Sequence, residues 1–77
     1  MEQEIEEKLE EIYNFTIYVK FHAFRLYYIF CKVDSKKVFE IPILWNARLT
    51  FEANIDNIKN KIDKEILTYY KKGKNND

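Results

Sequence analysis

The chain contains one histidine and one cysteine, His22 and Cys31, two residue types that enzymes use as acid–base groups and nucleophiles. A Cys–His pair works only when the side chains reach hydrogen-bond distance and a third group orients the histidine. No motif supplies that group, so we interpret His22 as an exposed strand residue and Cys31 as a buried structural one. One Cys and one His are also too few ligands for a structural zinc site. We predict no catalytic residue, no metal and no cofactor.

Carboxylates are concentrated near the N-terminus. Residues 1–12 contain six Glu and one Lys, a net charge of −5, whereas residues 59–74 contain six Lys, one Asp and one Glu, a net charge of +4. Paired carboxylates serve glycoside hydrolysis and metal binding, but the simplest interpretation here is the solvated face of a helix. An alternative is that these glutamates imitate nucleic-acid phosphates and occupy a basic groove of another protein. The whole chain has 13 basic and 13 acidic residues, which argues against a dedicated duplex-DNA-binding protein.

Aromatic and cationic side chains are interleaved from residue 18 to residue 27. On an open sheet, such aromatics stack on bases while the cations neutralise phosphates, so binding of single-stranded nucleic acid is one hypothesis. The hypothesis that we favour is a protein interface, with Tyr and aliphatic residues at its centre and cations at its rim. Both use the same predicted interaction face, which comprises Tyr18, Lys20, His22, Arg25, Tyr27, Ile29 and Cys31.

These residues belong to the most apolar stretch of the chain, residues 15–45. Within it, residues 15–22 alternate between apolar and polar with a period of two, which predicts a strand with one buried face. Residues 25–33 are largely apolar on both parities, which is typical of a central strand covered on both sides. A turn then leads to a third strand over residues 37–45, and Pro42, which has no N–H, favours an edge position for it.

The join between the first two predicted strands carries no turn signal. The sequence His22-Ala23-Phe24 contains none of the usual turn residues. A single long bent strand over residues 15–33, or a buried helix in the same place, is therefore an alternative to a hairpin. We favour three strands, because a single strand of that length would exceed the usual range of roughly 3–10 residues.

Two amphipathic helices are expected to flank the sheet. In residues 2–13, one helical face carries Ile5, Leu9 and Ile12. Residues 51–72 carry a longer apolar stripe at steps of three and four, the clearest periodic pattern in the chain.

The predicted fold class is α+β. We expect a two-layer sandwich in which a three-stranded antiparallel sheet is flanked by an N-terminal and a long C-terminal helix, in the order α-β-β-β-α. A single domain would span residues 1–72, and residues 73–77 would form a disordered C-terminal tail.

A 77-residue chain has a thin core, and such domains often gain stability from disulfides, metals or self-association. A single cysteine excludes an intramolecular disulfide, so we expect self-association. If both helices cover one sheet face, the other face stays apolar and requires a partner. We therefore predict a non-catalytic protein-interaction module that forms a homodimer. Another protein, nucleic acid, or an enzyme inhibited through the acidic N-terminal helix are the alternative partners.

The sequence also bears on location. The N-terminus is acidic and no apolar segment of a signal peptide follows it. Residues 21–31 are too short, and too interrupted by Arg25, for a membrane span. We expect a cytoplasmic protein without a membrane partner. The abundant Lys, Ile, Asn, Tyr and Phe have AT-rich codons, which favours an origin in an AT-rich genome such as that of some bacteria, a phage, or a plasmid or other mobile element.

Overall fold

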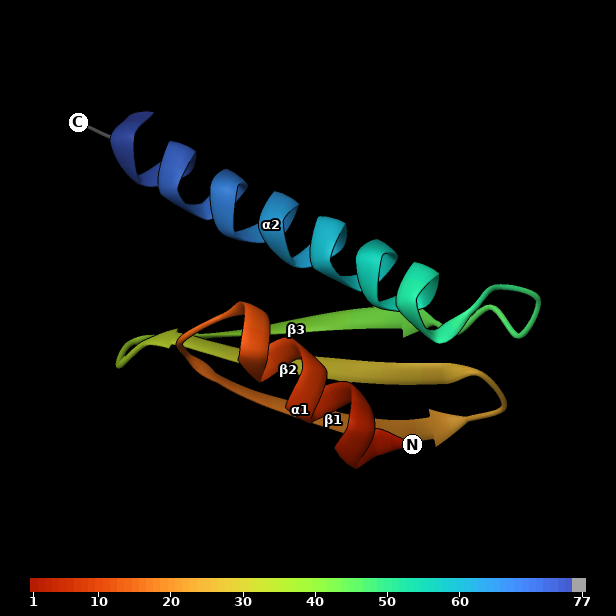
Figure 1. Cartoon of the computed structure of the whole chain (residues 1–77). Coiled ribbons are helices and arrows are strands. Elements are labelled where there is room, and N and C mark those ends of the chain that lie inside the picture. Colours follow the sequence, from red (N-terminus) through yellow and green to blue (C-terminus); the bar gives the residue numbers. More distant parts are fainter. Residues whose placement is uncertain (76–77) are drawn as a thin grey trace.

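The computed structural model describes residues 1–75 of the chain. Its elements follow in the order α1 (Glu2–Ile12), β1 (Thr16–Ala23), β2 (Leu26–Asp34), β3 (Lys37–Leu44) and α2 (Phe51–Asn75) (Figure 1). The predicted α+β class and the α-β-β-β-α order are confirmed. Residues 15–33 form two strands of a hairpin, and neither a single long strand nor a helix.

The sheet is antiparallel, with its strands in the order β1-β2-β3. Tyr18 of β1 pairs with Phe30 of β2, and Phe30 pairs with Glu40 of β3. Because paired residues point to the same side of a sheet, even-numbered residues of the three strands share one face and odd-numbered residues share the other. The buried odd-numbered residues are Ile17, Val19, Tyr27, Ile29, Cys31, Phe39, Ile41 and Ile43.

Both helices pack on the odd-numbered face. From α1, Ile5 and Leu9 are fully buried, and α2 contributes Ile55, Ile58 and Ile62 to the same core cluster. Figure 1 shows α1 crossing β1 and β2, while α2 begins beside the end of β3 and rises away from the strands toward its C-terminal end. The molecule is therefore a two-layer sandwich with one core between the helices and one sheet face.

The connection from β3 to α2 is fixed by two polar side chains. The Thr50 hydroxyl accepts the Ala53 N–H at 3.1 Å, so Thr50 caps the helix. The Asn54 side chain is buried, its Oδ1 accepts the Asn46 N–H at 2.9 Å, and its Nδ2 donates to the carbonyl of Asn46 at 2.9 Å. Every backbone group that this amide contacts lies in the loop or at the helix start, so it locks the loop against α2.

The C-terminal helix is longer than predicted. It extends to Asn75 and passes through Gly73, so the predicted end at Lys72 is wrong. One glycine costs a helix interior only about 1 kcal/mol relative to alanine, which a long helix tolerates. Residues 76 and 77 of the predicted disordered tail lie outside the described residues.

The turn between β1 and β2 is tight. Ala23 pairs with Leu26, which leaves Phe24 and Arg25 as the two turn residues, and the pairing is irregular between Phe21 and Ala23. Phe24 has a positive φ of 55° and its side chain is 96% exposed. Glycine or asparagine normally occupies such a position, because a bulky residue there costs on the order of 1 kcal/mol or more.

The prediction of which side of β2 is left uncovered by the helices is wrong. Tyr27, Ile29 and Cys31 were expected on the uncovered side of the sheet, but Val19 pairs with Ile29, and all three residues face the helices. The faces of a strand depend on the length of the preceding loop, because a shift of one residue moves every side chain to the other face. The two-residue turn with an irregularity at His22 sets a register that the sequence of the join does not specify.

Candidate functional site

The even-numbered side of the sheet, which we call the open face, is a largely apolar surface that the helices leave uncovered. Within residues 1–75, neither helix lies over it. Tyr18 is 63% exposed and Leu44 is 74% exposed on the two edge strands, while Leu26, Tyr28 and Phe30 on the central strand are half-buried by their neighbours. The open face comprises Thr16, Tyr18, Lys20, His22, Leu26, Tyr28, Phe30, Lys32, Val38, Glu40, Pro42 and Leu44.

Charge is distributed unevenly across this face. Its cations are Lys20 on β1 and Lys32 on β2, His22 follows Lys20 on β1, and its one carboxylate is Glu40 on β3. The His22 ring lies 5.4 Å from the Tyr28 ring at an interplanar angle of 75°, an edge-to-face contact that places His22 on this side. The open face therefore has an apolar centre, a basic side at β1 and an acidic position at β3.

The structure divides the seven predicted interaction residues into three groups. On the open face lie Tyr18, Lys20 and His22. In the core, against the helices, lie Tyr27, Ile29 and Cys31. Arg25 is exposed in the β1–β2 turn, where its carbonyl accepts the Trp45 N–H at 2.8 Å. The seven residues do not form one surface, and only the β1 part of the prediction survives as part of the open face.

Sequence reasoning missed the residues that β2 contributes to the open face, namely Leu26, Tyr28 and Phe30. The signal that identifies them is Lys32, which has the same parity and is exposed. A lysine is rarely buried without a partner, so it marks the solvent side of the strand. The aromatic residues Tyr28 and Phe30, which precede Lys32 on the same side of the strand, had instead suggested that this side faces the core.

His22 and Cys31 are separated by the sheet. His22 lies on the open face, whereas the Cys31 side chain is fully buried on the other side. Burial raises the pKa of the Cys31 thiol to about 11. The thiolate is the reactive form, so Cys31 is a weak nucleophile at neutral pH, and these two residues do not form a Cys–His pair.

Two glutamates of α1 protect the free edge of β1. The Glu6 carboxylate accepts the Val19 N–H at 3.1 Å, and the Glu2 carboxylate accepts the Phe21 N–H. These backbone donors point away from β2 and would otherwise be free to pair with a strand of another molecule. Part of the acidic character of α1 is thus explained by a structural role at the sheet edge.

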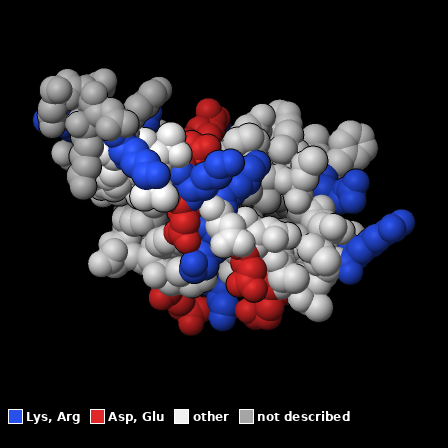
Figure 2. Space-filling model, turned by 90° about the horizontal axis from the view of Figure 1, so that it is seen from above, with Lys and Arg blue, Asp and Glu red and all other residues white. Residues whose placement is uncertain are grey.

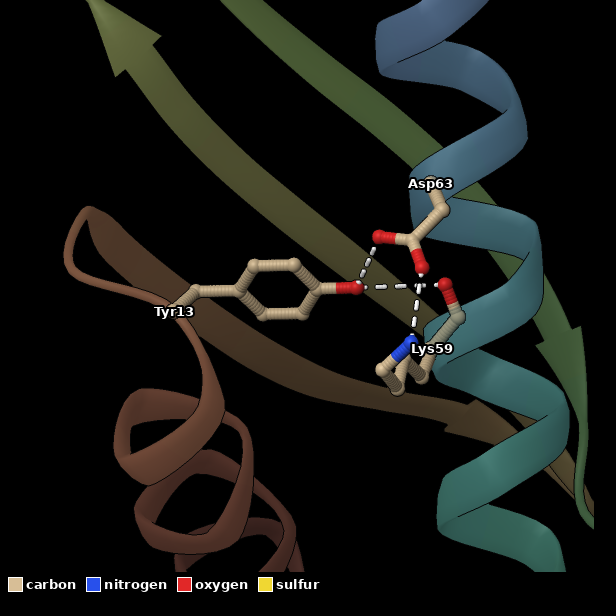
Figure 3. Close-up of polar contacts among 3 residues, drawn as sticks. All are labelled: Tyr13, Lys59 and Asp63. Carbon is tan, nitrogen blue, oxygen red and sulfur yellow. Dashed lines mark hydrogen bonds and ion pairs between the residues drawn. The ribbon is translucent and has the colours of Figure 1, made fainter.

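A second polar cluster joins the end of α1 to α2 (Figure 3). The Tyr13 hydroxyl contacts the Asp63 carboxylate and lies 3.1 Å from the Lys59 carbonyl oxygen, and the Lys59 ammonium lies 2.9 Å from Asp63. Burial, followed by the hydrogen bond to Asp63, raises the pKa of Tyr13, and the same hydrogen bond lowers the pKa of Asp63. Because every group has a partner within the chain, we interpret the cluster as a structural clasp between the helices.

The helix side of the molecule carries most of the formal charge. Figure 2, which views the molecule from above, shows basic side chains over the middle, with acidic side chains among them and along the lower edge. A shallow hollow of about 280 Å³ lies between α1 and the start of α2, with Phe51 at the α2 side. Its remaining lining residues are Glu4, Glu7, Lys8 and Glu11.

In the described part of the chain, no three side chains of His, Cys, Asp or Glu gather closely enough to hold a metal ion. Neither of the two helices, as far as they are described, has the length and apolar character to cross a membrane. Comparison with protein-family models, with curated proteins and with solved structures found no match to this chain.

Proposed function

We propose that this protein is a small interaction module that self-associates through the open face. The observation that supports the proposal is the composition of that face, in which seven of twelve side chains are apolar or aromatic while both helices lie on the opposite side. A surface of this kind is unfavourable in water and typically marks a site of association. Its layout also suits an interface, because Leu26, Tyr28 and Phe30 lie on the central strand while Lys20 and Glu40 lie on the two edge strands.

The small core supports the same proposal. A domain of this size buries only about 60% of the surface of its unfolded chain, so covering a further apolar face adds a significant share of its stability. No intramolecular disulfide is possible with one cysteine. Association would provide the burial that the chain lacks on its own.

Sedimentation over a range of concentrations tests this function. We expect a reversible monomer–dimer equilibrium with a dissociation constant on the order of tens of micromolar, as weak interfaces show. The variant Leu44→Glu places a charge on the open face and should weaken the dimer at least roughly tenfold. The matched control is Leu67→Glu, because Leu67 is a leucine of comparable exposure, 58%, on α2. A wild-type protein that stays monomeric at hundreds of micromolar refutes the proposal.

A second candidate function is binding of single-stranded nucleic acid on the same face. The register favours it, because Lys20 pairs with Tyr28 and places a cation beside a half-buried aromatic ring. Stacking on such a ring contributes about 1–3 kcal/mol per base. Binding of a fluorescent oligothymidylate at low salt, weakened by Tyr28→Ala and by added salt, would support this function. An absence of binding at low salt eliminates it.

A further inference from the structure

We infer that the partner on the open face is a second copy, packed face to face about a two-fold axis parallel to the strands, so that β1 lies over the partner's β3. This inference rests on the proposed function and gives it a geometry. The state of the two sheet edges and the position of each charge favour this arrangement, and the area of the face sets its strength.

Both edges of the sheet are unsuited to strand addition. On β1, the side chains of Glu2 and Glu6 occupy the Phe21 and Val19 N–H groups. On β3, Pro42 has no N–H, and its carbonyl accepts the Lys61 ammonium at 2.8 Å. Continuous pairing with a neighbouring strand requires these groups to be free, so association through the face is favoured over association through an edge.

Two aligned arrangements stack two copies of the open face. An axis perpendicular to the sheet would leave both faces pointing in the same direction, so the axis must lie between the sheets. Aligned packing, in which the strands of the two sheets stay roughly parallel or antiparallel, then places the axis either across the strands or along them. An axis across the strands places β1 over the partner's β1 and brings Lys20 toward its own counterpart. An axis along the strands places β1 over the partner's β3, where the acidic residue lies.

The axis along the strands therefore gives charge complementarity. Tyr18 pairs through Phe30 with Glu40, and Lys20 occupies the next row of the same face, about 7 Å further along β1. Stacked sheets lie about 10 Å apart, so Glu40 of the partner subunit would lie opposite the Tyr18 hydroxyl and within reach of the Lys20 ammonium. Symmetry repeats this contact, which gives two ion pairs per dimer.

The same arrangement has an unfavourable consequence that makes it testable. Lys32 lies on the central strand, near the axis, so it would approach Lys32 of the partner subunit at one end of the interface. An axis across the strands would instead place Lys32 over the opposite end of the face, near Leu26 of the partner subunit. Removal of the Lys32 charge should therefore tighten the dimer only in the proposed arrangement.

The area of the open face sets the strength of association. Three strands of this length cover roughly 14 Å by 26 Å, or on the order of 350 Å² per copy in projection. Specific stable interfaces bury about 800 Å² per partner. The accessible surface of the side chains exceeds the projected area of the sheet, but the total still falls short of that value, so this dimer should be weak. At such a size, charge pairing determines the orientation more than the affinity.

A charge-reversal cycle at Lys20 and Glu40 tests the geometry. Each single variant, Lys20→Glu and Glu40→Lys, should weaken the dimer about tenfold in sedimentation at low salt, because like charges then meet twice. The double variant should return to within about threefold of the wild-type protein, since both pairs are restored with reversed sign. Lys32→Gln should tighten the dimer severalfold.

The outcomes separate the two proposals. If the wild-type protein dimerises and Leu44→Glu abolishes the dimer, but the double charge variant is no stronger than the single variants, the axis along the strands is wrong and the proposed function stands. If the wild-type protein is monomeric, both fail. Circular dichroism spectra of all variants establish that they fold, which is expected because Lys20, Lys32 and Glu40 are exposed.

Discussion

The clasp between the helices can be tested by removing one oxygen atom, with the variant Tyr13→Phe. The ring of Tyr13 stacks on Phe15 with 4.9 Å between centroids, and phenylalanine preserves that contact. The substitution deletes the hydroxyl that contacts the Asp63 carboxylate and the Lys59 carbonyl oxygen. The change in stability therefore reports on the polar contacts alone.

The expected loss follows from the nature and exposure of these contacts. A hydrogen bond to a charged group contributes about 1.5–3 kcal/mol when buried. The Asp63 side chain is 47% exposed, so water screens the contact and reduces its value. We expect Tyr13→Phe to lower the free energy of unfolding by about 1 kcal/mol, which corresponds to a decrease in Tm of about 4–8 °C for a domain of this size.

The pH dependence of stability gives an independent test of the same contact. The pKa of Tyr13 is raised in the folded state, chiefly by burial, so its contribution is present below the unfolded value near 10 and is lost as the pH rises above it. The pKa of Asp63 is lowered, chiefly by the Tyr13 hydrogen bond, so its contribution is present above about pH 4 and is lost as the pH falls below it. The Tyr13→Phe variant should lack the alkaline loss and show a smaller acid loss.

Urea unfolding followed by circular dichroism, at several pH values from acidic to alkaline, measures both effects. The control is Tyr70→Phe, because Tyr70 is an exposed tyrosine of α2. If Tyr13→Phe has the stability of the control at neutral pH, and the same loss of stability above pH 10 as the wild-type protein, the clasp does not contribute as we argue.

Three further predictions concern other parts of the chain. Phe24→Gly should raise the free energy of unfolding by about 0.5–1 kcal/mol, because glycine adopts a positive φ without strain, and unchanged or lower stability in thermal unfolding would contradict this. Glu6→Ala should expose the Val19 N–H and increase aggregation in light scattering relative to the control Glu10→Ala, and equal behaviour of the two variants would remove the protective role of Glu6. Cys31 should react with a thiol reagent only on unfolding, since its side chain is buried and the pKa of its thiol is about 11, and fast reaction in native buffer would show that the core opens.

The sequence was sufficient for the elements and their order because each element has its own periodicity. The stripe of Ile55, Ile58 and Ile62 is typical of a helix, and the alternation through Ile17 and Val19 favours a strand with one buried face over the helix that was the alternative there. These patterns are local, so no knowledge of the tertiary structure was needed to interpret them.

The orientation of β2 could not be derived in the same way. Both parities of this strand are apolar, so hydrophobicity does not distinguish its faces, and the answer depends on the register of the β1–β2 hairpin. That register involves a turn at Phe24, a residue that turn statistics disfavour. The contacts of Glu2 and Glu6 with β1 could not be predicted from the sequence either, because they depend on how α1 docks against the sheet edge.

The departure of α2 from the sheet has a practical consequence. Beyond Ile62, the helix carries no further fully buried residue up to Lys71, and Leu67 and Tyr70 face solvent. Ile66 and Tyr69 still pack against the core, Tyr69 through an edge-to-face contact with Phe39 at 5.3 Å, but both are only partly buried. Amide hydrogens in this half should therefore exchange faster than those of the first half. A fluorophore or an immobilisation tag attached there would lie on the opposite side of the sheet from the open face, and would leave that face free for measurement.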